Sequence, residues 1–287
     1  MYIKIMIQMD EFEKDYFEKL KKLARGYTNK RQELAKSRIK MFAAALTRQL
    51  IDEGEKFDLI LSAGNSGLFM DKITEMVYER LGIQTPQRII LPIFRFKDDS
   101  GKIALFDNSV LGKMLEEKLK NLPENSSVLF IDDEIMQGIT VKAALELILS
   151  ERPDIKHLEA LIIAEHHFFE WHYKIPKVSV IFFAYSRLIQ RLNGNIGYLV
   201  PPDLYSKILP FIPEAISYNH AMAIVIGGGL KRIGKDGIPY FDNKAEEICM
   251  QKIPGFKQIK DSLLNDIKVL VVEGINEYKK GEIKFRF

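Results

Sequence analysis

The 287-residue chain is 47% hydrophobic and 28% charged, which is typical of a folded globular protein and excludes a largely disordered one. Its formal net charge of +3 is too small to indicate a polyanionic partner, so we do not expect nucleic acid to bind. Cys249 is the only cysteine, which excludes an internal disulfide. The sequence shows neither a secretory signal nor the apolar run of about 18 residues that a membrane span needs. We therefore expect a cytoplasmic protein with no membrane partner.

Residues 1–53 are predicted to form an N-terminal helical arm. Apolar side chains recur at spacings of three and four from Phe12 to Leu23 and again from Leu34 to Leu50, which is typical of amphipathic helices. The stretch Gly26–Lys30 interrupts this pattern, so we expect a break between two helices there.

Residues 54–192 alternate short apolar runs with helical patterns. The apolar runs span 57–62, 88–94, 127–131, 158–164 and 178–184, and helical patterns end at Leu81 or span 110–122 and 140–150. Apolar runs without internal alternation are typical of strands buried on both faces. The order of strands and helices therefore predicts an α/β core, an open parallel β-sheet with helices on both faces that is Rossmann-like.

Residues 193–287 are predicted to form a mostly helical lobe that packs on the core. Prolines interrupt its first part, and we expect a helix from near Pro213 to Ile226. The stretch from Gly229 to Asp236 comes within one residue of a phosphate-binding P-loop. Asp236, however, stands where that loop needs a hydroxyl for magnesium, so we interpret the stretch as a basic turn after a helix.

The stretch from Ser127 to Thr140 carries the clearest chemical signal. A buried strand is followed by Asp132 and Asp133, and a short loop with Gly138 then opens a helix. Ligands of open α/β sheets bind at the carboxyl ends of strands, and a helix N-terminus holds anions. Two neighbouring carboxylates need hydroxyl donors or a cation instead. The combination predicts a ribose 5-phosphate site, against the alternative that these residues only form a turn.

This stretch resembles the signature of the type I phosphoribosyltransferases. The resemblance implies that Asp132 and Asp133 act in catalysis by binding the ribose hydroxyls and Mg²⁺, and that the 5-phosphate is bound by the loop Met136, Gln137, Gly138, Ile139 and Thr140. By order along the chain, the diphosphate of 5-phosphoribosyl-1-pyrophosphate would contact Ala63, Gly64, Asn65, Ser66 and Gly67. Residues 97–108 would form a mobile loop, and the acceptor would contact Tyr185 and Arg187.

The resemblance implies a glycosyltransferase of nucleotide metabolism that passes the phosphoribosyl group to an unidentified acceptor and releases diphosphate, and it is compatible with a homodimer. Three positions depart from the family pattern. Gln137 replaces a hydroxyl residue, Met136 replaces an acid-base aspartate of purine enzymes, and Glu134 replaces an apolar residue. These departures leave open a non-catalytic regulatory protein that binds phosphoribosyl pyrophosphate or a nucleotide. A third alternative is a metal-dependent hydrolase that uses Asp132 and Asp133.

Two further groups of polar residues have weaker signals. The stretch from Glu165 to His172 holds three of the five histidines, and its residues either bind a metal or, as we favour, pack a loop. Contact with the acceptor through His166 or His167 is a further interpretation. Arg95, Lys97 and Lys102 either neutralise diphosphate or, by default, carry solvated charge.

Overall fold

The computed structural model describes residues 11–93, 95–97, 103–105, 108–135, 139–165, 178–182, 196–235 and 238–283. Its centre is a five-stranded sheet in the order β2-β1-β5-β6-β7, and every neighbouring pair is parallel. The strands are β1 (Leu59–Ala63), β2 (Gln87–Leu91), β5 (Ser127–Ile135), β6 (His157–Glu165) and β7 (Val178–Phe182). The predicted α/β class, an open parallel sheet with helices on both faces, is confirmed.

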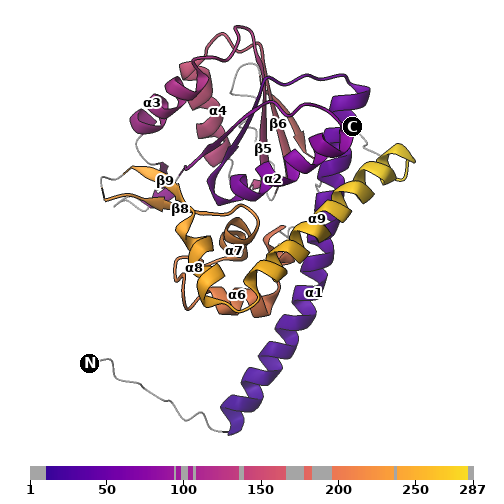
Figure 1. The fold of residues 1–287 in the computed structure, drawn as a ribbon, viewed down its shortest axis with the longest axis vertical. Coiled ribbons are helices and arrows are strands. Elements are labelled where there is room, and N and C mark those ends of the chain that lie inside the picture. Colours follow the sequence, from indigo (N-terminus) through magenta and orange to yellow (C-terminus); the bar gives the residue numbers. More distant parts are fainter. Residues whose placement is uncertain are drawn as a thin grey trace.

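Each face of the sheet is covered by its own set of helices (Figure 1). Alternate strand residues point to opposite faces. Side chains such as Leu61 and Phe130 pack with helices α3 (Asn108–Leu119) and α4 (Ile139–Glu151). Ile60 and Leu129 join the other core, with helices α1 (Glu11–Thr47), α2 (Gly64–Leu81), α7 (Tyr218–Val225) and α9 (Phe256–Lys279). Both faces are therefore buried, which explains the unbroken apolar runs.

The N-terminal arm is one long helix, so the predicted break at Gly26–Lys30 is wrong. Helix α1 runs through this stretch and continues as a short π-helix, η1 (Arg48–Asp52). One glycine inside a helix costs about 1 kcal/mol, which is too little to end it. Figure 1 shows α1 lying beside α9. Their backbones touch, because a Cβ on Gly274 would lie 2.3 Å from the Lys40 carbonyl oxygen.

The C-terminal lobe contains η3 (Ile196–Leu199), α6 (Pro202–Ile208), α7, β8 (Leu230–Ile233), β9 (Pro239–Asp242), α8 (Lys244–Lys252) and α9. The helix predicted from Pro213 begins only at Tyr218, because Ser217 caps it by accepting a hydrogen bond from the His220 backbone N–H at 3.3 Å. The predicted basic turn in 229–236 is also wrong. Residues 230–233 form strand β8, which pairs antiparallel with β9 and is fastened by a 2.8 Å ion pair between Arg232 and Asp242.

A second small hairpin stands where a loop was predicted over residues 97–108. Strands β3 (Arg95–Lys97) and β4 (Ile103–Leu105) pair antiparallel, so Lys97 and residues 103–105 of the predicted loop are extended, and Asn108 already begins α3. Residues 98–102 and 106–107 lie outside the described part of the chain.

Candidate functional site

Strands β1 and β5 form the point where the sheet changes direction. The chain proceeds from β1 outward to β2 on one side, and then crosses to β5, β6 and β7 on the other. In open α/β sheets with this 2-1-3-4-5 order, ligands bind beyond the carboxyl ends of the two strands at the crossing. The residues that end β1 and β5 are therefore the first place to look for a site.

Asp132 and Asp133 lie in β5, which continues to Ile135 instead of ending before them as predicted. Their side chains are only 5% and 3% exposed. Asp132 Oδ1 accepts hydrogen bonds from Ser66 Oγ at 2.7 Å and from the Asp133 backbone N–H at 2.9 Å. Asp133 Oδ2 accepts one from Asn219 Nδ2 at 3.2 Å. The two carboxylates thus have different side-chain partners, the first in the opening turn of α2 and the second on α7.

The turn between β1 and α2 brings the predicted diphosphate segment to Asp132. Ala63 ends the strand, and residues 64–67 form the first turn of α2 rather than a separate loop. Gly64 has φ +68°, which an L side chain rarely adopts. Ser66 is the residue of this turn that reaches β5, through its hydrogen bond to Asp132. The structure therefore brings two predicted parts of the site, which are 66 residues apart in the chain, into direct contact.

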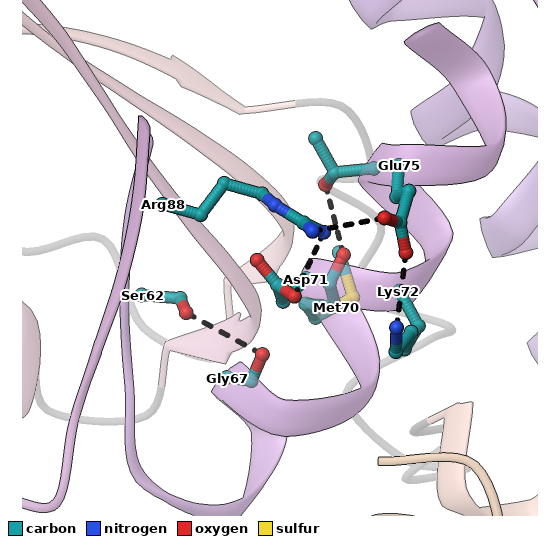
Figure 2. Close-up of polar contacts among 8 residues, drawn as sticks. Ser62, Gly67, Met70, Asp71, Lys72, Glu75 and Arg88 are labelled. Atoms are coloured by element: carbon teal, nitrogen blue, oxygen red, sulfur yellow. Dashed lines mark hydrogen bonds and ion pairs between the residues drawn. The ribbon is translucent and has the colours of Figure 1, made fainter. Parts of the chain in front are cut away.

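Gly67 lets helix α2 approach the sheet closely at this turn. A Cβ there would lie 2.9 Å from Ile90 Cγ2 and 3.0 Å from Ser62 Oγ. Figure 2 shows the Ser62 hydroxyl pointing to the Gly67 carbonyl oxygen, with a distance of 3.4 Å. The close packing places the first turn of α2, with Ser66, against the carboxyl edge.

Further along α2, a charged network ties the helix to β2 (Figure 2). Arg88 contacts Asp71 at 3.0 Å and Glu75 at 2.8 Å, and Lys72 contacts Glu75 at 3.0 Å. Burial raises the pKa of Asp71, and the Arg88 charge opposes that rise. Burial would also raise the pKa of Glu75, but hydrogen bonds from Lys72 and Arg88 outweigh it and lower the pKa. This network anchors the helix that carries the predicted diphosphate segment.

The C-terminal lobe supplies two side chains that the sequence did not predict. Asn219, at the start of α7, donates to Asp133. Lys231, in β8, donates its backbone N–H to Asn65 Oδ1 at 2.8 Å and its ammonium Nζ to the Ile93 carbonyl oxygen at 2.6 Å. Asn219 sits in a segment without a recognisable motif, and Lys231 sits in the stretch 229–236, which resembles a P-loop but was interpreted as a basic turn. Only the folded chain places both residues at this edge.

His220 lies beside these residues in α7. Its Nδ1 atom is buried and has no hydrogen-bond partner among the residues that the structure describes. Burial lowers the pKa of His220, and the nearby Lys231 ammonium lowers it further, against a hydrogen bond with the Glu214 backbone. The imidazole is therefore held in its neutral form near pH 7.

The donor set at the edge fits Mg²⁺. This ion is typically bound by one or two carboxylates, with water and substrate phosphates completing the shell, so Asp132 and Asp133 suffice on the protein side. Within the described ranges, no group of three or more His, Cys, Asp or Glu side chains could hold a metal by itself.

The structure describes only part of the predicted site. Thr140 is half-buried in the first turn of α4, while Met136, Gln137 and Gly138 lie outside the described residues. Tyr185, Arg187 and the residues 166–172 also lie outside them. No helix within the described residues is long and apolar enough to cross a membrane.

No protein-family model and no curated protein matches this chain. Among solved structures, the chain is similar to a hypothetical protein from Neisseria gonorrhoeae with bound ppGpp, with 16% identity over 55% of this chain and 90% of that one and a TM-score of 0.32. It is also similar to the hypoxanthine phosphoribosyltransferase of Trypanosoma cruzi, with 11% identity, coverage of 47% and 78%, and a TM-score of 0.29. A hypoxanthine phosphoribosyltransferase from Staphylococcus aureus is also similar, with 17% identity over 53% of this chain and 76% of that one and a TM-score of 0.30. TM-scores this low decide no question of activity, so the function has to be inferred from the edge of the sheet itself.

Proposed function

We propose that this chain binds 5-phosphoribosyl-1-pyrophosphate with Mg²⁺ and transfers the phosphoribosyl group to an acceptor. The observation that carries the proposal is the 2.7 Å hydrogen bond from Ser66 to Asp132. It joins the two predicted halves of the site at the carboxyl ends of β1 and β5, where this sheet order favours ligand binding. In this proposal residues 54–192 carry the chemistry, residues 1–53 form an arm, and residues 193–287 form a lobe that supports the core.

The two carboxylates take different roles in this proposal. Asp132 lies beside the β1–α2 turn and accepts hydrogen bonds from the ribose hydroxyls. Asp133 is held by Asn219 of α7 and orients the strand end. The backbone of Ala63–Gly67 and the Ser66 hydroxyl bind the diphosphate, and Thr140 with the Gly138 loop binds the 5-phosphate at the start of α4.

In the reaction, a lone pair of the acceptor forms a bond to ribose C1 while the bond from C1 to the diphosphate oxygen breaks. The electron pair leaves with diphosphate, and the acceptor loses a proton. Positive charge develops on the ribose ring, and the Asp132 and Asp133 carboxylates stabilise it electrostatically. Mg²⁺ held by Asp132 would neutralise the charge of the departing diphosphate.

The proposal is tested by an acceptor screen. The protein is incubated with Mg²⁺ and labelled phosphoribosyl pyrophosphate, and purine, pyrimidine and other nitrogen acceptors are added one at a time. A transferase releases diphosphate only when its acceptor is present. Release of inorganic phosphate without an acceptor would instead identify a hydrolase.

A regulatory protein that binds the same ligand without turnover is the second candidate. Gln137 and Met136 favour it, because they replace a phosphate-binding hydroxyl and an acid-base carboxylate of the resembled family. Tight binding of phosphoribosyl pyrophosphate with no release of diphosphate under any acceptor would support this candidate.

A further inference from the structure

Lys231 is hydrogen-bonded to the carboxyl edge of the sheet through both its backbone N–H and its side-chain ammonium. Its backbone N–H donates to Asn65 Oδ1 in the β1–α2 turn, at 2.8 Å. Its ammonium donates to the carbonyl oxygen of Ile93, just beyond β2, at 2.6 Å. A residue of the C-terminal lobe thus spans the ends of two core strands.

The ammonium of Lys231 also lies over Gly64. A Cβ built on Gly64 would lie 3.9 Å from Lys231 Nζ. Gly64 has φ +68°, so its backbone is presented without a side chain. The same ammonium contributes to the lowered pKa of His220. Its positive charge therefore acts on the turn where the diphosphate is proposed to bind and on the adjacent end of α7.

We infer that Lys231 is a diphosphate-binding residue of the proposed site, contributed by the C-terminal lobe. The inference rests on the proposed function and adds to it a cation outside the core. A lysine ammonium is a compact charge with three donors and is a common ligand of phosphates. The hydrogen bond to Asn65 uses only the backbone, so it fixes β8 whatever the side chain is. The side chain adds a hydrogen bond to the Ile93 carbonyl oxygen and brings its ammonium to the β1–α2 turn, where its N–H donors can serve a phosphate.

The experiment compares three ligands by calorimetry in the presence of Mg²⁺: phosphoribosyl pyrophosphate, inorganic diphosphate and ribose 5-phosphate. The variant is Lys231→Met, which keeps the backbone bond to Asn65. The matched control is Lys235→Met. Lys235 is an exposed lysine of the same hairpin, so this substitution removes an equal charge. Lys231→Met should weaken both diphosphate-containing ligands by about 10- to 100-fold, as expected for a hydrogen bond to a charged group. Ribose 5-phosphate should bind as it does to the parent.

Equal weakening of all three ligands would mean that Lys231 only supports the structure, and the inference would fail. Unchanged affinity for diphosphate would overturn it as well, with the proposed function intact. If the parent binds neither phosphoribosyl pyrophosphate nor diphosphate, the proposed function fails and takes the inference with it. Lys231→Gln, which keeps a donor for the Ile93 carbonyl but has no charge, serves if the Met variant does not fold, and the same results apply to it.

Discussion

Two acidic pairs, one on helix α2 and one on β5 beside its first turn, have different hydrogen-bond partners. Asp71 and Glu75, on the helix itself, receive the guanidinium of Arg88 at 3.0 and 2.8 Å. Asp132 and Asp133, on β5, receive neutral donors, a hydroxyl from Ser66 and an amide from Asn219. Figure 2 shows the first pair, in which the carboxylates of Asp71 and Glu75 face the guanidinium of Arg88.

The difference indicates what each pair is for. A guanidinium cancels the charge of a carboxylate as it orients it, which suits a contact that holds a helix to a strand. A neutral donor orients a carboxylate and leaves its negative charge in place. Burying carboxylates is costly for folding, and we propose that a cation or a ribose diol of the ligand offsets part of that cost at this edge.

The largest expected effect is on stability at the first pair. Arg88→Met leaves the buried Asp71 without its guanidinium, and we expect the free energy of unfolding to fall by about 3 kcal/mol. Chemical denaturation measures it. Affinity for phosphoribosyl pyrophosphate in the folded protein should not change. Lys72→Met, at the exposed rim of the same network, is the control and should cost less than about 0.5 kcal/mol.

The second pair should show the reverse pattern. Asp132→Asn keeps the shape and removes the charge, so we expect a loss of about 1.5 to 3 kcal/mol in the binding of phosphoribosyl pyrophosphate, and a change in its Mg²⁺ dependence, with little loss of stability. Asp133→Asn should instead lower the free energy of unfolding, because Asp133 accepts from Asn219. If both variants bind as the parent does, the assignment of this edge as the ribose site is wrong.

A smaller effect is expected at Ser66. Ser66→Ala removes the donor that orients Asp132 and the hydroxyl proposed to contact diphosphate, so affinity should fall by about 1 kcal/mol. Isothermal calorimetry measures it. Ser206→Ala, an exposed serine in α6, is the matched control and should leave affinity unchanged. Equal affinity in both variants would argue against a ligand at the β1–α2 turn.

The smallest effect is a pH dependence that separates this edge from the Arg88 network. The pKa of His220 is lowered from its ordinary value of 6.5, so the folded state takes up a proton less readily than the unfolded state. The contribution to stability is therefore present above about pH 6.5 and is lost as the pH falls. His220→Gln should reduce the loss of stability between pH 7.5 and 5.5, as measured by denaturation at each pH. An identical loss in parent and variant would contradict this.

The sequence predicted the sheet because each strand is a short apolar run buried on both faces, and it predicted Asp132 and Ser66 because both follow such runs. It could not predict Asn219 or Lys231. Asn219 meets Asp133 across 86 residues, and Lys231 meets Asn65 across 166. Strand β8 is four residues long, too short for alternation to be recognised, so a turn was predicted in its place. Long-range contacts of this kind depend on packing that no single segment encodes.

The pairing of α1 with α9 has a consequence for synthesis of the protein. About 200 residues separate the two helices, so at typical ribosomal rates α1 is complete roughly 10 to 40 s before α9 follows. Until then the apolar face of α1, with Ile39 and Phe42, lacks one of its covering helices. The nascent chain must therefore pass through a long interval with that face accessible to chaperones or to other chains. Position 274 requires glycine because α9 packs directly against the backbone of α1 there. The apolar face of α1 is therefore protected only after α9 has docked at this close distance.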